Sequence, residues 1–219
     1  MHKITNTGYP ALCLALLLSL FSTATVSASE GGATGVVRID KAVMAGQVTL
    51  EFSPYAPETG DLIARDMEVF FSQDELFGIG IWESEPGSMT IADLEYDELM
   101  YILDGSMIMT DNNGHSETYQ AGEGAISPKN WQGTLTVPEG GVRMLYAFYL
   151  YDGKNKTTDL IRLDSERLAG MKLGEYAPYE PDMGTLVARG HDYFYSQDEN
   201  YSTGVWESKP GVITLENLE

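Results

Sequence analysis

The sequence contains little cysteine, histidine or basic residue. Its one cysteine, Cys13, and one of its three histidines lie within the first 30 residues. The rest of the chain therefore has no disulfide, thiolate nucleophile or cysteine metal site. The chain has 13 Lys and Arg against 33 Asp and Glu, which gives a net charge of -20. Because phosphate and anionic lipid binding rely on clustered cations, this argues against nucleic acid and membrane surfaces as partners.

The N-terminal residues 1–28 have the pattern of a secretory signal peptide. Lys3 precedes an apolar run from Ala11 to Phe21, and the small residues that end at Ala28 suit cleavage there. The apolar run is shorter than the roughly 20 residues that span a bilayer. We therefore expect an exported protein, periplasmic or extracellular, without a membrane attachment after cleavage.

An internal repeat with a constant offset organises the rest of the chain. The tetrapeptide SQDE occurs at residue 72 and again at residue 196, and WES occurs at residue 82 and again at residue 206. The second copy stops at Glu219, the counterpart of Glu95. We expect a first domain at residues 36–160 and a partial second copy at residues 161–219. The expectation is a fragment of a longer product, with a true stop at Glu219 as the alternative.

Short apolar or alternating runs bounded by turn residues predict strands. Asp104-Gly105 and Asn113-Gly114 separate such runs and are hairpin signals, because glycine adopts positive φ at little cost. One helical stretch is expected at residues 165–171 and its repeat counterpart at residues 40–46. The chain is therefore predicted to be all-β and antiparallel. The predicted strands are residues 77–82, 99–103, 106–110, 117–120, 133–137 and 142–151.

From residue 87 to residue 149 the sequence resembles the cupin superfamily. Its spacing of Gly, Glu and Gly matches the first cupin motif, and a Gly with a Pro six residues later matches the second. The matching residues are Gly87, Glu98 and Gly105, then Gly122 and Pro128. The sequence looks most like the branch with ethanolamine-utilisation cupins and the (S)-ureidoglycine aminohydrolase cupin domain. This resemblance implies a double-stranded β-helix barrel of jelly-roll type, in tandem with an incomplete second barrel.

The metal-binding histidines of the cupin motifs are missing. Counted from Glu98, the two positions of the first motif fall at residues 91–94, where Asp93 is the one ligand type, and the position of the second motif is Gly133. Metal-dependent cupins hold a divalent transition metal with three His and one Glu. We therefore predict no metal or other cofactor in the first barrel. A complete second barrel could still hold a divalent metal.

Other ligand types offer weaker alternatives. His115 follows the Asn-Gly turn, which predicts an exposed hairpin tip, and His191 corresponds to Met67 in the repeat, which favours a structural role. A hard cation such as Ca²⁺ accepts oxygen ligands. Weak candidates for such a site are Glu95, Asp97 and Glu98.

Alternation along the strand puts Glu98, Met100 and Ile102 on one face. If this face is the barrel interior, Glu98 is a buried carboxylate that needs a partner, for which Arg143 is one candidate. A structural ion pair and ligand binding are both open for Glu98. Met100 is a pocket candidate by the same alternation.

Two tryptophans are further pocket candidates, because their rings could stack on a ligand at the barrel mouth. Trp82 has a repeat counterpart in Trp206, and its presence in both copies favours core packing. Trp131 lies beside the lost histidine position, where pocket and packing are equally open.

These patterns favour an exported tandem cupin whose first barrel is metal-free and binds a small molecule or serves structurally. The alternative is a metal-dependent small-molecule hydrolase, like ureidoglycine aminohydrolase, with its active site in the missing part of the second barrel. Whether the protein is an enzyme stays open, and so does a homodimer. The expected partner is a small-molecule ligand, with no nucleic acid and no membrane.

Overall fold

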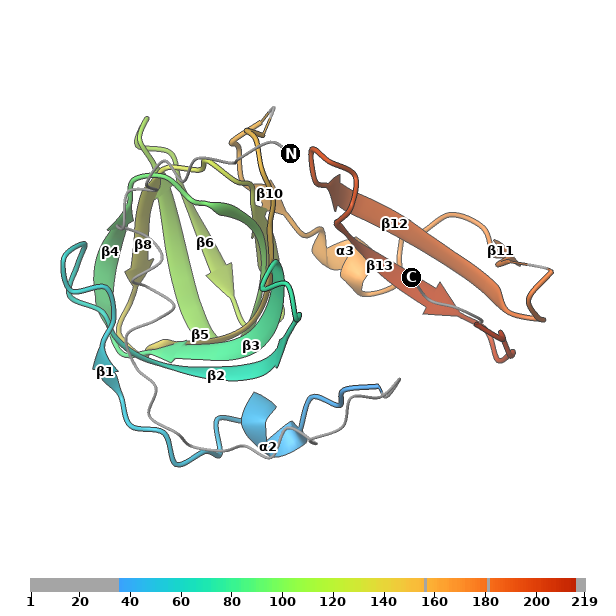
Figure 1. The fold of residues 1–219 in the computed structure, drawn as a ribbon, viewed down its shortest axis with the longest axis horizontal. Coiled ribbons are helices and arrows are strands. Elements are labelled where there is room, and N and C mark those ends of the chain that lie inside the picture. The colour runs from blue at the N-terminus through green and yellow to red at the C-terminus, as the bar shows by residue number, and fades with distance from the viewer. Residues whose placement is uncertain (1–35, 156, 181, 216–219) are drawn as a thin grey trace, which may run out of the picture.

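The computed structural model describes residues 36–155, 157–180 and 182–215. These residues form two antiparallel sheets, with only the short helices α2 (Lys41–Met44) and α3 (Ser165–Leu168) in the described ranges. The larger sheet curls into a barrel, and the smaller one extends away from it (Figure 1). The predicted all-β class is confirmed. The predicted signal peptide, residues 1–28, lies outside the described residues.

The strands of the larger sheet follow the order β1-β2-β3-β9-β5-β7-β10, while β8 joins β4 to β5 and β6 pairs with β5. The predicted strands correspond to β3, β5, β6, β8 and β9. The bounds are β1 (Ser53–Pro54), β2 (Ile63–Phe71), β3 (Phe77–Ser84), β4 (Gly87–Ile91), β5 (Tyr96–Asp111), β6 (Ser116–Gln120), β7 (Gly124–Ser127), β8 (Gly133–Val137), β9 (Val142–Leu150) and β10 (Ile161–Arg162).

Strand β5 corrects one prediction. Asp104-Gly105 is not a hairpin turn, because β5 runs through it with a register shift between Ile102 and Asp104. Gly105 has φ +73°, and a Cβ there would collide with the carbonyl of Gly141. The irregularity lies where β5 changes partners, from β7 and β9 to β6 and β8. The Asn113-Gly114 turn does join β5 to β6, as predicted.

The main core lies on one face of the curled sheet, which we call the inner face. It carries alternate residues of the strands, such as Ala64 on β2, Trp82 on β3, Met100 on β5 and Tyr146 on β9. On the opposite, outer face, Val43 of α2 packs with Met67 of β2 and Ile81 of β3. The chain therefore buries both faces of its central strands.

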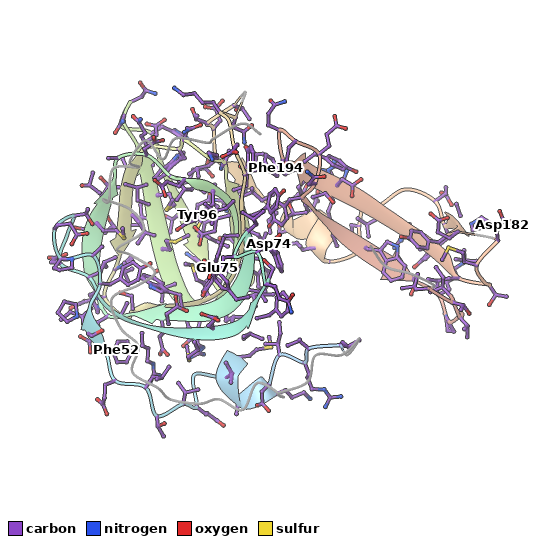
Figure 2. All side chains as sticks on the ribbon, viewed as in Figure 1. Phe52, Asp74, Glu75, Tyr96, Asp182 and Phe194 are labelled. Atoms are coloured by element: carbon purple, nitrogen blue, oxygen red, sulfur yellow. The ribbon has the colours of Figure 1, made fainter. Side chains whose placement is uncertain are left out.

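The smaller sheet contains β11 (Ala177–Pro178), β12 (Val187–Tyr195) and β13 (Ser202–Ser208). Phe194 of β12 packs with Ile126 and Leu163 on the outside of the barrel (Figure 2). The Tyr149 hydroxyl also donates to Asp198 Oδ2 at 2.9 Å, and the Tyr149 ring stacks on Tyr201. These contacts hold the end of β12 and the β12–β13 turn on the barrel.

The pairing within the smaller sheet follows that of β1, β2 and β3 at the repeat offset. Ala64 pairs with Ser84 in the larger sheet, and Ala188 with Ser208 in the smaller. The helices that precede each sheet lie within the predicted stretches and are N-capped by Asp40 and Asp164. Among the described residues β13 pairs only with β12, whereas β3 pairs with β2 and β9. No helix in the described part is long and apolar enough to cross a membrane.

Candidate functional site

The inner face carries two carboxylates that come from different strands. Glu98 of β5 alternates with the buried Met100, and Asp66 of β2 alternates with the buried Ala64. The predicted alternation around Glu98 is confirmed, because its odd-numbered neighbours face outward instead. We call Asp66 and Glu98 the inner-face pair. Sequence reasoning identified Glu98 and missed Asp66.

Asp66 is held by a tyrosine from a strand that is not its neighbour. The hydroxyl of Tyr146 on β9 donates to Asp66 Oδ1 at 2.8 Å, across the intervening strand β3. Gly80 makes this reach feasible, because a Cβ at that position would lie 2.5 Å from Tyr146 Oη. Gly78 plays the same part for Phe148, whose ring lies 2.5 Å from the position of a Cβ there.

Both carboxyl groups are surrounded by protein, although water reaches them: Asp66 is exposed and Glu98 is half-buried. Desolvation and, after it, the negative charge of Asp66 raise the pKa of Glu98 to about 8. Desolvation likewise raises the pKa of Asp66 to about 6, against the opposing effect of the Tyr146 hydrogen bond. At neutral pH the pair therefore carries roughly one negative charge, with Glu98 mostly protonated.

Aromatic rings surround the inner-face pair. Tyr55 meets Trp82 edge to face at 5.6 Å, and Tyr146 stacks on Phe148 at 6.3 Å between ring centroids. The pKa of the Tyr55 phenol is raised, first by desolvation and then by the charges of Asp66 and Glu98, which places this ring near both carboxylates. The site thus combines two acids with aromatic walls.

Two buried polar atoms beside the pair have no hydrogen-bond partner among the described residues. Ser127 is 1% exposed and its Oγ is unpartnered. It pairs with Glu98 in the β5–β7 register, so both side chains lie on the inner face. Trp82 pairs with Asp66 in the same way, and its Nε1 is also unpartnered. Five other buried side-chain atoms of the described residues are also unpartnered, Asp97 Oδ2 among them. The two atoms beside the pair are therefore available to another molecule but do not mark a site by themselves.

The other predicted pocket residues are core residues. Trp82 is 4% exposed and Trp131 is 2% exposed, and both belong to the main core with Met100. Packing is therefore confirmed for Trp82. The repeat argument does not extend to Trp206, which is 51% exposed on β13. Its ring lacks the covering strands that bury Trp82 within the barrel.

Arg143 does not partner Glu98, contrary to the prediction. Alternation along β9 puts Arg143 on the outer face, opposite to Met144 and Tyr146. Its guanidinium lies 3.8 Å from Glu83 and 3.5 Å from Asp104. The described residues show no hydrogen bond to the Glu98 side chain, so its stabilisation comes from protonation.

The structure separates the three weak candidates for a hard-cation site. Asp97 is fully buried and faces away from the inner face, where its Oδ1 accepts from the Lys129 amide at 2.7 Å and from Asn155 Nδ2 at 2.9 Å. Glu95 is exposed, and Glu98 lies on the inner face. Within the described ranges no three His, Cys, Asp or Glu residues converge. Asp97 therefore has a structural role.

The inner face does not fit the three-histidine and one-glutamate set of metal-dependent cupins. A Cβ at Gly133, the lost histidine position, would lie 2.6 Å from the Trp131 ring, so no side chain can enter there. Asp93 accepts a hydrogen bond from Asn130 at an exposed site. His115 lies at an exposed hairpin tip, as predicted, and His191 contacts Tyr193 on β12.

Two surface hollows lie elsewhere in the structure. One of about 300 Å³ lies between α3 and β13, and one of about 340 Å³ lies on the outer face beside Val69 and Ile79. The second is lined by apolar residues alone, and the first contains Glu207, which is paired with Arg189. Neither offers unpaired polar groups, so we place the candidate site on the inner face.

Comparisons with known proteins agree with this fold. Residues 71–146 match the family model of the EutQ-like cupin domain. The EutQ protein of Clostridium difficile aligns at 24% identity and a TM-score of 0.37, over 42% of this chain and 71% of EutQ. A protein of unknown function of the DUF861 family from Pseudomonas syringae pv. tomato aligns at 18% identity and a TM-score of 0.54, over 66% of this chain and 59% of that protein. No curated protein matches the sequence.

The structural likeness shows the fold alone, since these identities are low. A cupin superfamily protein from Desulfitobacterium hafniense also aligns, at 19% identity and a TM-score of 0.34, over 41% of this chain and 78% of that one. The predicted resemblance to cupins is confirmed, in a branch that the EutQ-like model describes. Residues 71–146, about a third of the chain, are thus similar to the EutQ-like cupin domain.

Proposed function

We propose that the barrel binds a small polar molecule on its inner face, at Asp66 and Glu98, without a transition metal. The observation that carries this proposal is a pair of solvent-reachable carboxylates whose surroundings raise both pKa values. Carboxyl groups with raised pKa values cluster at functional sites, where burial and neighbouring charges tune acids for their task. The unpartnered Ser127 Oγ beside Glu98 supports the same proposal.

The competing explanation is that the inner-face pair is part of the structure and binds no ligand. A structural carboxylate is expected to accept hydrogen bonds from the protein, as Asp97 Oδ1 does from Lys129 and Asn155, although Asp97 Oδ2 has no partner among the described residues. On the inner face Asp66 accepts a hydrogen bond from Tyr146, and the described residues show none to the Glu98 side chain. A ligand that donates to Glu98 would supply that missing contact.

Methionine-methyl NMR tests the proposal directly. Met100 lies on the inner face one alternation from Glu98, while Met171 is 52% exposed and far along the chain. Screening small polar molecules against the ¹³C-methyl-labelled protein should give a saturable shift of the Met100 signal with Met171 unchanged. Saturable binding that leaves Met100 unmoved, or that survives Glu98→Gln together with Asp66→Asn, would reject the inner face as the site. Stoichiometric Mn, Fe, Ni or Zn in the purified chain would contradict the metal-free assignment.

We further propose that the domain is duplicated, that residues 161–219 begin a second copy, and that the protein is exported. The support for duplication is the shared strand register together with matched ion pairs, Arg65 with Glu83 and Arg189 with Glu207. A completed second copy with metal-binding histidines would favour the alternative of a metal-dependent hydrolase. Sequencing the gene beyond the codon for Glu219 decides between these outcomes, and secretion of the chain with cleavage after Ala28 tests export.

A further inference from the structure

We infer that the molecule bound on the inner face is a small organic cation, such as an alkylammonium ion, held between Asp66 and Glu98. This inference rests on the proposed function and names the ligand class of the same site. It follows from the charges that face the site, from its aromatic walls and from its unpartnered oxygen atom.

The titratable groups that face the inner-face pair include no base among the described residues. Three arginines of the barrel form ion pairs, and none of these pairs includes Asp66 or Glu98. They are Arg65 with Glu83, Arg143 with Glu83 and Asp104, and Arg162 with Glu117 and Glu123, while Arg167 lies beyond β10. Lys129 Nζ is bonded to the Tyr151 carbonyl. Among the described residues no cation faces Glu98, so in this inference the ligand supplies the positive charge that ionises it.

The aromatic walls favour an organic cation over a metal ion. The Tyr55 phenol lies near both carboxylates and the Tyr146 hydroxyl bonds to Asp66, so a cation held there would meet aromatic rings, whose faces attract ammonium groups by cation–π interaction. Hard metal ions prefer six or more oxygen ligands, and among the described residues no three acidic or histidine side chains converge to hold one. An alkyl chain instead gains from contact with the apolar side chain of Met100.

The number of acceptors also suits a primary ammonium group. Such a group has three N–H donors. The inner-face pair provides two carboxylate acceptors, and Ser127 Oγ beside Glu98 is a third, buried and unpartnered. Binding would satisfy this hydroxyl, which is otherwise costly to leave without a partner.

Proton release is a consequence that a neutral ligand would not share. A bound cation favours the ionised form of Glu98, so binding at neutral pH should expel a proton and strengthen as the pH rises from 6 to 8. The slope cannot exceed about tenfold in affinity per pH unit for one proton. The charge of Glu68 on β2 acts on Asp66, and that of Asp66 acts on Glu98. The charges of the pair in turn raise the pKa values of Tyr55 and Tyr146, and Glu98 and Asp97 raise that of Tyr201 on the far side of β5.

Calorimetry with size-matched probes tests the inference. We would titrate the protein with n-butylammonium, tetramethylammonium, n-butanol and butyrate, and follow the Met100 methyl signal in parallel. We expect an ammonium probe to bind and to release a proton. Its affinity should be about tenfold lower for Glu98→Gln and for Asp66→Asn. Glu139→Gln, an exposed acid in the β8–β9 turn, is the matched control and should bind like the parent. Circular dichroism confirms that each variant is folded.

The outcomes separate the two proposals. If butanol or butyrate shifts Met100 as strongly as the ammonium probes, the ligand is not a cation, and the inference fails while the inner-face site stands. If ammonium binding leaves Met100 unmoved or is equal in Glu98→Gln, the inference fails as well. If none of the probes and none of the screened molecules reaches Met100, the proposed function fails with it.

Discussion

Raising the pH should destabilise this protein through a single carboxyl group, that of Glu98. Its pKa is about 8 in the folded protein, against an ordinary value of 4.5. A group whose pKa is raised on folding binds its proton more tightly in the native state. Its stabilising effect is therefore fully present below the unfolded value and is lost as the pH rises through the folded one.

The size of the effect follows from the two pKa values. Each unit of difference is worth about 1.4 kcal/mol, so full ionisation of Glu98 would cost on the order of 5 kcal/mol. Since water reaches this half-buried side chain, screening reduces that figure. Between pH 6 and pH 8 we expect the free energy of unfolding to fall by about 1–2 kcal/mol. Asp66 titrates at lower pH, with a pKa of about 6, and contributes little to this interval.

Urea unfolding at several pH values measures the effect. The parent protein and Glu139→Gln should lose stability between pH 6 and pH 8, while Glu98→Gln should show a smaller slope. Any other group that titrates in this interval cancels in the difference between the variants. Equal slopes for the parent and Glu98→Gln would refute the reasoning, because Glu98 would then ionise without cost.

Three further changes probe the packing around the site, each by urea unfolding. Gly80→Ala should lower the free energy of unfolding by about 1–3 kcal/mol, since the new methyl group would lie 2.5 Å from Tyr146 Oη and 2.7 Å from its Cζ; an unchanged unfolding midpoint would contradict this clash. Asp97→Ala should lower the free energy of unfolding by about 2 kcal/mol or more, because the backbone amide of Lys129 loses its acceptor. An unchanged unfolding midpoint would contradict a structural role for Asp97. His115→Ala should stay within about 0.5 kcal/mol, as expected of an exposed turn; a larger loss would reveal a missed contact.

The position of Glu98 was predictable because it depends on a local rule. Side chains alternate along a strand, and the apolar residues at 100 and 102 fix which face is buried. The same rule applied to β9 would have excluded Arg143 as its partner, since Met144 and Tyr146 face inward and Arg143 cannot. The error came from pairing charges without checking their faces.

Asp66 was not predictable in this way, because its role depends on non-local pairing. Nothing near it in the sequence shows that β3 will lie between β2 and β9, or that Tyr146 will reach across. The alternate glycines at 78 and 80 were the available signal, since inward positions without side chains leave room for large neighbours. The repeat gave no help, because the counterpart of Asp66 is Gly190.

Asp104-Gly105 shows the limit of turn signals. The dipeptide has the local chemistry of a hairpin, yet β5 continues past it because both halves of the strand find partners in the sheet. Cross-strand pairing therefore overrides a local preference here, and glycine is used for a bend that brings it against Gly141.

The carboxyl ¹³C signals of Glu98 and Asp66, followed by NMR from pH 3 to pH 10, test the central claim most directly. The account predicts that Glu98 titrates near pH 8 and Asp66 near pH 6, because both lie on the desolvated inner face of the barrel. Titration of both groups near pH 4, as in an exposed acid, would contradict it. The inner face would then hold no tuned carboxylate pair for a ligand.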